Sequence, residues 1–465
     1  MTRFISRHLN ADYGSGSKIW IVLQVLAQAQ ANGCRLYRLE IRIGNLTMKH
    51  LVGGISSAGR ALPLLNGRAL YIDRAKGPYL WTDEGVRMID TALGFGAVLL
   101  GHADPVVNSA VVEAVEKGSM PAFAHAGEET AAEALSAPCG PLQSVIFTNS
   151  GSEAVHLACR IARAVTGRRV VAKIAAGFDG WFDPVAFGNA GSSEALLGNG
   201  ECRPIRQDVT LTRYNDVADL ERLFSENTEI AAVIFEPLLA NAGSIEADIS
   251  YLRALESLAR AHGALLIADE VLMGFRSRFG LASQGLELDP DIATVGKAIG
   301  NGFAVAAVLG RPEIMEAADD GRAVRAGTYC GNPVATAAVT ATLSRLRVCD
   351  YDGLARRGDL VRNALVAAFA NRGATITTTG YGMVFTPWYA PTQPKSYEHA
   401  TSIANPERSL LLHLALRRAG VMVMPQAFGR LYLSFSHDEE VCGETAKAFR
   451  IAVSSLPIEA DRIPT

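Results

Sequence analysis

The sequence predicts an α/β protein with a large, doubly wound, mostly parallel β-sheet and a second, smaller α+β domain. Three observations support this fold class. From residue 144 onward, short apolar runs alternate with stretches of helical pattern. Polar clusters follow the ends of these runs, where parallel sheets bind ligands. The 465 residues exceed what one compact core accommodates, so at least two lobes are expected.

The elements of the large layer follow from apolar runs and their flanking turns. Aromatic and β-branched residues between turn signals predict hairpin strands within about 68–91, and Pro105 opens a helix where no amide donor is needed. Strands are expected at 144–147, 170–174, 230–235 and 264–268, with helices at 151–165 and about 250–262. After about residue 345 the pattern becomes α+β, with helices near 357–371 and 405–419 and strands at 382–385 and 430–434.

These patterns divide the chain into four segments. Residues 1–47 are either a poorly packed extension or lie upstream of a true start at Met48. Residues 48–105 form an N-terminal segment that joins the small domain, 106–345 the large domain, and 346–465 the C-terminal small domain.

The composition narrows the class of function. Hydrophobic residues make up 49% and charged residues 20% of the chain, as in a globular enzyme. A net charge of −3 gives no reason to expect nucleic acid or a membrane surface as a partner, and no apolar run is long enough to span a bilayer. The seven scattered cysteines form no CxxC pair, so we expect reduced thiols, a cytoplasmic location and no metal site.

Asp269 and Lys297 carry the most specific chemistry. Asp269 follows the apolar run 264–268, and a buried carboxylate needs a partner. Lys297 lies among Val, Gly, Ala and Ile, where desolvation lowers the pKa of a lysine and makes it nucleophilic toward an aldehyde. Pyridoxal phosphate requires this pair: the lysine forms a Schiff base, and the acid keeps the pyridine nitrogen protonated. The alternatives are a helix-capping Asp269 and a solvated Lys297, which fits its neighbours poorly.

A candidate phosphate site lies in Phe147–Ala154, a strand end, a small-residue turn and a helix start. Ser150, Gly151 and Ser152 present backbone amides and hydroxyls at a helix N-terminus, which binds phosphate. The alternative is a plain capping turn with Ser150 as N-cap and Glu153 in the first turn. No nucleotide-binding glycine motif lies nearby.

Three further clusters follow other strands. Phe178 could stack on a flat cofactor, or simply anchor a loop. Glu236 and Asn241 follow the strand 230–235, where ordinary turn chemistry is the alternative. Thr328 lies in a glycine-rich loop before a small-residue helix and by itself is typical of a cap.

Taken together, these segments resemble a class III (ω-type) aminotransferase with the pyridoxal-phosphate-dependent fold type I, over about residues 53–440. The resemblance implies that Lys297 binds the cofactor aldehyde and moves the proton between Cα and C4′, while Asp269 pairs with the pyridinium nitrogen. It places Val271 and Phe178 on opposite faces of the ring, and it assigns the phosphate to Gly151 and Ser152.

The resemblance also implies a homodimer. Thr328 would complete the phosphate cup of the neighbouring subunit. Glu236 and Asn241 are similar to a Glu-Pro-x-x-Gly-Asn segment that lies near the cofactor in the family.

The N-terminal part narrows the subgroup. Gly53–Arg60 is similar to a stretch of glutamate-1-semialdehyde aminomutases and their β-amino-acid aminotransferase relatives, which implies that Arg60 clamps a substrate carboxylate. Phe95 stands where the family usually has Trp near the substrate.

Several positions depart from the family pattern. Phe178-Asp179 replaces the usual Tyr-His, so that stacking is kept and a negative charge is added, and Ala240 replaces a typical Gly. Arg430 stands where semialdehyde aminomutases have small residues. It is either a second contact for a substrate carboxylate or phosphate-sugar, or a surface arginine.

The expected activity is a ping-pong transfer of an amino group from an amino acid or amine donor to a keto acid or aldehyde acceptor. One alternative is an aminomutase that returns the amine to the same carbon skeleton. A remote alternative is a non-catalytic PLP-binding regulator, for which residues 1–47 are too short to supply a DNA-binding module. The residues do not identify the substrate.

Overall fold

The computed structural model describes residues 50–191 and 208–457. The chain separates into two compact units, Met1–Ile72 and Asp73–Thr465. The described part of the first unit contains the turns η3 (Val52–Gly54) and η4 (Ala58–Arg60). The predicted extension 1–47 and the alternative start at Met48 lie outside the described residues, and the finer domain division stays a prediction.

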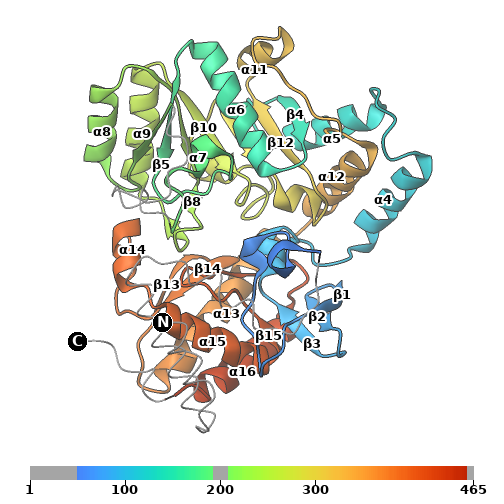
Figure 1. Cartoon of the computed structure of the whole chain (residues 1–465), viewed down its shortest axis with the longest axis vertical. Helices are drawn as coiled ribbons and strands as arrows, with labels where there is room; N and C mark the ends of the chain where they lie inside the picture. Colours follow the sequence, from blue (N-terminus) through green and yellow to red (C-terminus); the bar gives the residue numbers. More distant parts are fainter. Residues whose placement is uncertain (1–49, 192–207, 458–465) are drawn as a thin grey trace. The chain divides into compact units, whose positions relative to one another are not determined.

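The second unit is built on a seven-stranded sheet of order β4-β12-β11-β10-β7-β5-β6 within its described residues (Figure 1). Strand β10 pairs in parallel with β11 and β7, and β5 pairs in parallel with β7 and β6, while β12 runs antiparallel between β4 and β11. The expected mostly parallel sheet is confirmed. The strands are β4 (Ser144–Thr148), β5 (Val170–Ile174), β6 (Val209–Thr212), β7 (Ile230–Phe235), β10 (Leu265–Glu270), β11 (Ile292–Val295) and β12 (Ala306–Gly310).

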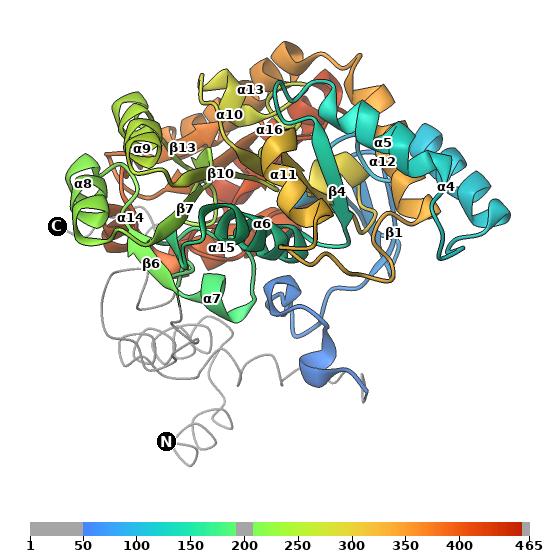
Figure 2. The same cartoon turned by 90° about the horizontal axis from the view of Figure 1, so that it is seen from above.

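Both faces of this sheet are covered by helices, which explains why its strands are apolar throughout. Alternate strand residues such as Ile234 and Ile267 pack with α6 (Gly151–Thr166) on one face. Their neighbours Val233 and Phe235 join the other core, which includes residues of α8 (Val217–Glu226) and α9 (Ile249–Ala261). Figure 2 shows α6 and α7 (Asp183–Ala186) on one side of the strands.

The central strands extend further than the sequence predicted. Strand β10 was expected to end at Ala268, but its pairing continues through Asp269↔Thr294 and Glu270↔Val295. The two acids can remain in the strand because neighbouring donors satisfy them: Glu270 accepts hydrogen bonds from the backbone N–H groups of Ala282 (3.0 Å) and Ser283 (2.7 Å). Asp269 therefore lies within β10, opposite Thr294 of β11. Thr294 precedes Lys297 by three residues.

The remaining elements form smaller sheets and their helices. One sheet has the order β1-β2-β3-β15, another β13-β14-β16, and β8 pairs with β9 in a hairpin. The strands are β1 (Ile72–Lys76), β2 (Tyr79–Thr82), β3 (Arg87–Asp90), β8 (Leu238–Leu239), β9 (Ile245–Glu246), β13 (Thr377–Tyr381), β14 (Val384–Trp388), β15 (Val421–Met422) and β16 (Leu431–Tyr432). The helices are α3 (Leu93–Gly96), α4 (Pro105–Lys117), α5 (Ala126–Ser136), α10 (Ala282–Gly285), η6 (Lys297–Gly300), α11 (Pro312–Asp319), α12 (Pro333–Leu346), α13 (Tyr351–Ala370), α14 (Tyr397–Ile403), α15 (Pro406–Arg418) and α16 (Glu439–Ser454).

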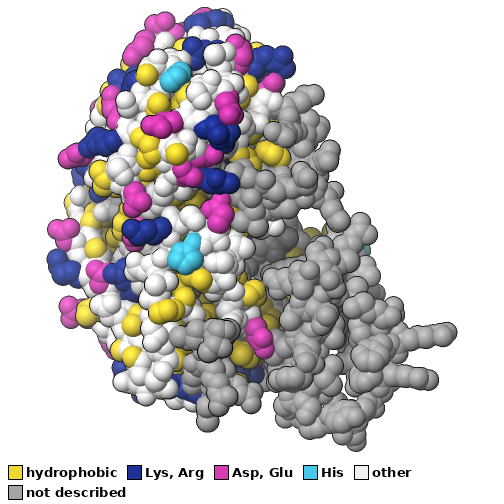
Figure 3. Space-filling view, turned by 90° about the vertical axis from the view of Figure 1, so that its left-hand side faces the viewer, with side chains coloured by type: hydrophobic (Ala, Val, Ile, Leu, Met, Phe, Trp, Pro, Cys, Tyr) yellow, Lys and Arg dark blue, Asp and Glu magenta, His cyan; other side chains and the backbone are white. Residues whose placement is uncertain are grey.

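The small-domain strands were located less well than the central ones. Strands expected at 382–385 and 430–434 are found at Val384–Trp388 and Leu431–Tyr432. On the face shown in Figure 3, acidic and basic side chains are interspersed. Within the described residues, none of the helices combines the length and apolar character needed to cross a membrane.

Candidate functional site

Lys297 begins the short helix η6, directly after β11 and Gly296. Its backbone φ is +45°, a left-handed value that costs a side-chain-bearing residue about 1–2 kcal/mol. Burial lowers the pKa of its ammonium to about 8, helped by the guanidinium groups of Arg430 and Arg276 and opposed by nearby carboxylates. Roughly a fifth of the amine is therefore neutral at about pH 7.4, far more than for an ordinary lysine, and the neutral form attacks an aldehyde.

Asp269 is 4% exposed and lies one strand away from Lys297. Its Oδ1 accepts hydrogen bonds from the N–H of Val271 (3.0 Å) and the hydroxyl of Thr294 (3.1 Å). Burial, followed by the charges of Asp179 and Glu236, raises the pKa of Asp269 well above its ordinary value. No arginine or lysine lies within ion-pair distance of it in the described part of the chain. A cationic N–H at this position would supply the missing partner.

The turn before α6 has the capping geometry that was the alternative for Ser150. The Ser150 hydroxyl accepts from the N–H of Glu153 (3.3 Å), and the Glu153 carboxylate accepts from the N–H groups of Ser150 (2.9 Å) and Asn149 (2.7 Å). The first-turn amides of Gly151 and Ser152 have no carbonyl partner within a helix. They are the donors that remain for an anion, and the role of Ser150 in cofactor binding stays a prediction.

Val271 packs between the turn before α6 and the residue that precedes Lys297. A Cβ placed on Gly151 would lie 2.9 Å from Cγ1 of Val271, and one placed on Gly296 would lie 3.4 Å from the same atom. Val271 is thus packed between the helix start and the residue that precedes Lys297. A Cβ on Gly180 would lie 3.0 Å from the Ser152 hydroxyl, so the loop that follows β5 reaches the same place.

Phe178 lies in this loop, and its side chain is 45% exposed. Its backbone N–H donates to Oε1 of Glu236 (2.9 Å), which is buried past the end of β7. Burial and the charge of Asp179 raise the pKa of Glu236 to about 7. An exposed aromatic ring whose backbone is held by the site is suited to cover one face of a planar ligand.

Arg276 is a buried member of the site that sequence reasoning did not assign. Its Nε donates to the carbonyl of Leu272 (3.0 Å), and Nη2 donates to the carbonyl of Gly96. Nη1 is buried without a hydrogen-bond partner, and burial lowers the pKa of the guanidinium to about 10. Through Gly96, Arg276 holds the left-handed turn of α3, in which Phe95 has a φ of +60°. The position of Arg276 in the segment Asp269–Arg276 was the available signal.

Arg430 lies beside this cluster, just before β16. Its Nε donates to the hydroxyl of Tyr432 (2.7 Å), and both Arg430 and Arg276 lie over the Tyr432 ring, 5.9 Å and 5.5 Å from its centroid. No carboxylate among the described residues lies within ion-pair distance of Arg430. Two guanidinium groups thus contribute positive potential near Lys297, and the carboxylates of Asp269 and Glu236 oppose it.

Asp179 adds a negative charge, as the sequence indicated, and the structure pairs that charge with a lysine. Its Oδ2 lies 3.1 Å from the ammonium of Lys173, a residue of β5 that is completely buried. The signal for this lysine was its place inside the apolar run Val170–Ile174.

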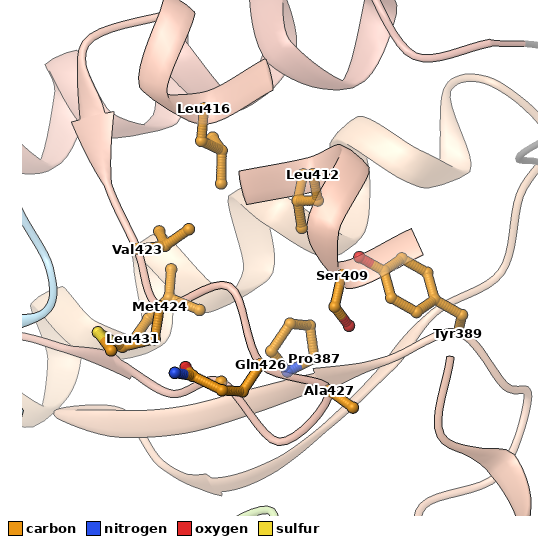
Figure 4. Close-up of a pocket in the computed structure, with 11 residues that line it drawn as sticks. Pro387, Tyr389, Ser409, Leu412, Leu416, Val423, Met424, Gln426, Ala427 and Leu431 are labelled. Carbon is orange, nitrogen blue, oxygen red and sulfur yellow. The ribbon is translucent and has the colours of Figure 1, made fainter. Parts of the chain in front are cut away.

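Other predicted residues are placed without a link to the Lys297 cluster. Asn241 lies half-buried in the turn between β8 and β9, and Thr328 lies exposed in the loop before α12. Arg60 belongs to the first unit, in η4. Figure 4 shows a separate cavity of about 20 Å³ in the small domain, room for one water molecule, lined by residues such as Leu412 and Val423. None of the predicted site residues lines that cavity.

The residues fit pyridoxal phosphate on three counts. Lys297 supplies an amine with a lowered pKa, and Asp269 supplies a buried carboxyl that has no ion pair within the described part of the chain. Gly151 and Ser152 supply free helix N-terminal amides close to both, through the packing of Val271.

Comparison with known proteins gives consistent matches. The family model for "Aminotransferase class-III" matches residues 65–369. A glutamate-1-semialdehyde 2,1-aminomutase of Methanothrix thermoacetophila is 34% identical over 404 residues, covering 86% of this chain and 92% of the relative. An ω-transaminase structure from Sphaerobacter thermophilus superposes with a TM-score of 0.80 at 29% identity, covering 87% of this chain and 95% of that one. A β-phenylalanine aminotransferase structure from Variovorax paradoxus gives 0.79 at 26% identity, covering 92% and 96%. The chain therefore belongs to the class-III aminotransferase family and is a pyridoxal-phosphate-dependent enzyme of fold type I.

Proposed function

We propose that this enzyme is an aminotransferase that takes an amino group from a carboxylate-bearing donor and passes it to a keto acid or aldehyde in a second half-reaction. The observation that carries the proposal is Arg430, a half-buried guanidinium near Lys297 with no carboxylate within ion-pair distance among the described residues. A substrate carboxylate would supply that partner through two parallel hydrogen bonds.

The protein groups divide the work between them. When bound, the pyridoxal ring acts as an electron sink for the carbanion formed at the substrate Cα. Lys297 Nζ would act as general base and general acid: it would remove the Cα proton of the donor in the first half-reaction and deliver a proton to Cα of the acceptor-derived product in the second. Asp269 holds the proton on the pyridine nitrogen, while Phe178 and Val271 cover the two ring faces. The amides of Gly151 and Ser152 hold the phosphate, and Ser150, Glu236 and Asn241 complete the cofactor site.

The substrate end has three candidate contacts. Arg430 and Arg60 would each bind a carboxylate, and Phe95 would line the substrate pocket. Support for Phe95 comes from its turn, which Arg276 holds through the carbonyl of Gly96 in a left-handed conformation. Strained backbone held by a buried charged group is found most often at functional sites.

The second candidate function is intramolecular amino transfer, as in a glutamate-1-semialdehyde 2,1-aminomutase. It is favoured by the name of the 34%-identical relative. The two activities differ in stoichiometry. An aminotransferase leaves its cofactor in the amine form and releases one keto acid per site when it meets a donor without an acceptor. An aminomutase releases a rearranged product from a single substrate and needs no acceptor.

The test combines that stoichiometry with a substitution of Arg430. We expect a panel of amino acids to release about one keto acid per site in the absence of an acceptor. Arg430→Gln should lower kcat/KM for these donors about 10- to 100-fold, the value of a lost charged hydrogen bond, and leave amine donors without a carboxylate unchanged. The exposed Arg418→Gln serves as the control. Catalytic rearrangement of one substrate without an acceptor would replace the proposal with the aminomutase.

We also propose a cytoplasmic homodimer in which Thr328 reaches the phosphate of the partner's site. Supporting this, Thr328 lines an open groove of about 480 Å³ together with Phe123, whose side chain is 84% exposed. A large exposed aromatic beside such a groove is typical of an interface. The cytoplasmic location is supported by five free cysteines among the described residues.

A further inference from the structure

Lys173 is a fully buried charged group next to the site. It lies in the middle of β5 with an exposure of 0%, and its ammonium has four oxygen partners. It donates to the carbonyls of Gly177 (2.7 Å) and Val185 (2.8 Å) and to Oδ1 of Asn189 (2.5 Å), and it lies 3.1 Å from Oδ2 of Asp179. A buried ammonium with this many partners is held in one position.

These partners all belong to the segment that carries Phe178. Gly177 and Asp179 flank Phe178 directly, and both are bound by Lys173. Asn189 in turn donates through Nδ2 to the carbonyl of Gly180 (3.0 Å), which lies against Ser152. The loop after β5 is therefore held around the Lys173 ammonium, and it carries the exposed side chain of Phe178.

Asp179 lies among acids. It is 2% exposed, and a Cβ placed on Gly177 would lie 3.2 Å from Asp179 Oδ2 and 3.5 Å from Glu236 Oε1. Lys173 is the only cation within ion-pair distance of Asp179 in the part of the chain that the structure describes. The ionisable groups that face Asp179 are Lys173 of β5, Glu236 after β7, Asp269 of β10 and Cys159 of α6.

We propose that Lys173 is a positioning residue: its buried ion pair with Asp179 fixes the loop that presents Phe178 to the cofactor ring and offsets one of the three acids on that side of the site. The part that concerns the ring rests on the proposed place of Phe178. The ion pair does not depend on the place of Phe178, so the ion pair and the ring contact can be tested separately.

The consequence of breaking the pair depends on which partner is removed. Lys173→Met leaves a carboxylate buried without a cation, and burial disfavours its charged form. That variant is expected to lose stability, relative to wild type, as pH rises above about 4, the ordinary pKa of an aspartic acid, because the unfolded chain then ionises while the buried carboxyl resists ionisation. Asp179→Asn leaves the ammonium with three oxygen acceptors and is expected to be milder. The double variant removes both charges and should lose the pH-dependent penalty.

The experiment measures the melting temperature of the cofactor-loaded protein from pH 5 to pH 8 and its cofactor dissociation constant by dialysis. At neutral pH we expect Lys173→Met to melt about 5–10 °C below wild type and the difference to shrink toward pH 5. Lys173→Met should also raise the cofactor dissociation constant about tenfold, with most of that loss recovered in Lys173→Met/Asp179→Asn. Lys117→Met breaks an exposed pair with Glu113 (2.5 Å) and serves as the control, with no change expected.

Two results would overturn the proposal. A penalty for Lys173→Met that is the same at pH 5 and pH 8, or one that adding Asp179→Asn does not relieve, would show that Lys173 acts by packing alone. If Lys173→Met does not fold, Asp179→Asn is compared with wild type instead, and an unchanged melting temperature and cofactor dissociation constant in that variant would overturn the proposal. Phe178→Ala tests the proposed contact between Phe178 and the cofactor ring. An unchanged cofactor dissociation constant in this variant would rule out that contact, and the result for the ion pair would still hold.

Discussion

At the scale of single residues, the site depends on groups kept in states that water would not favour. Lys297 has a left-handed backbone and a pKa lowered to about 8, and Asp269 has a raised pKa and no cation within ion-pair distance among the described residues. Under the proposed assignment, one ligand would answer both shifted pKa values, because it offers an aldehyde to the amine and a cationic N–H to the carboxyl. The protein is thus preorganised for pyridoxal phosphate.

The role of Asp269 can be tested with a change of cofactor. Asp269→Ala should lower kcat/KM about 100-fold or more, because it removes the anionic partner of a buried cation. A cofactor methylated at the pyridine nitrogen carries a permanent positive charge, so it should restore part of the activity of this variant. The same cofactor should not raise the activity of wild type. The exposed Asp289→Asn is the control. Wild-type kinetics in Asp269→Ala would rule out the pairing.

The lowered pKa of Lys297 predicts a pH dependence for cofactor attachment. Because the neutral amine is the nucleophile, the rate at which cofactor-free enzyme binds pyridoxal phosphate covalently should rise with pH and level off above about 8. Stopped-flow absorbance measures this rate. A midpoint near the ordinary lysine value of about 10.4 would contradict the desolvation of Lys297.

The residues predicted from the sequence share one property, which is that their neighbours along the chain already reveal their chemistry. Lys297 and Asp269 stand in apolar segments, so the cost of burial is visible locally. Arg276 and the Lys173–Asp179 pair were not predicted, because their partners come from other segments: Gly96 for Arg276, and Val185 and Asn189 for Lys173. Phe178 was predicted, but the ammonium that holds its loop was not.

At the scale of elements, the site is assembled from the ends of strands and the start of one helix. The register Asp269↔Thr294 places the acid beside β11, and the tight packing of Val271 against Gly151 and Gly296 connects α6 to η6. The central strands were predicted closely because both of their faces are buried. The two-residue strands β15 and β16 are set by tertiary pairing, and the expected strand 430–434 was accordingly too long.

The close packing of Gly151 against Val271 can be tested by adding a methyl group at position 151. Gly151→Ala introduces a Cβ that would lie 2.9 Å from Val271, an overpacking that costs about 1–3 kcal/mol, so the cofactor dissociation constant should rise about tenfold. Adding Val271→Ala creates room for the new methyl group, so Gly151→Ala should raise the dissociation constant much less in a Val271→Ala background than in wild type. Gly443→Ala in α16 meets no atom within 4 Å and is the control. An additive effect of the two site substitutions would contradict the packing.

At the scale of the whole molecule, the proposed dimer makes each site depend on two chains, with Lys297 from one and Thr328 from the other. This dependence predicts complementation. Lys297→Ala dimers are expected to be inactive, and Thr328→Ala dimers to bind the cofactor about tenfold more weakly, since one charged hydrogen bond to phosphate is lost. In a mixed dimer, one site carries both substitutions and the other carries neither.

Mixing the two variants under conditions that exchange subunits should therefore restore sites with wild-type cofactor affinity, up to about one per mixed dimer. Activity titrated at limiting cofactor measures them. If Thr328 acted within its own chain, no mixed dimer would contain an unaltered site and no recovery would be seen. Phe123→Glu, which places a charge at the edge of the Thr328 groove, should shift the protein toward monomer in light scattering.

The central claim is that Lys297 is the residue that binds pyridoxal phosphate covalently, and chemical trapping tests it most directly. Borohydride reduction of the loaded enzyme fixes the lysine–cofactor bond, and mass spectrometry of the digested chain locates it. Eight lysines compete for the label, of which Lys173 is also buried beside the site. We predict one phosphopyridoxyl group per chain, on the peptide that contains Lys297, and its loss in Lys297→Ala. A label on Lys173 or any other lysine, or no stoichiometric label at all, would contradict the account.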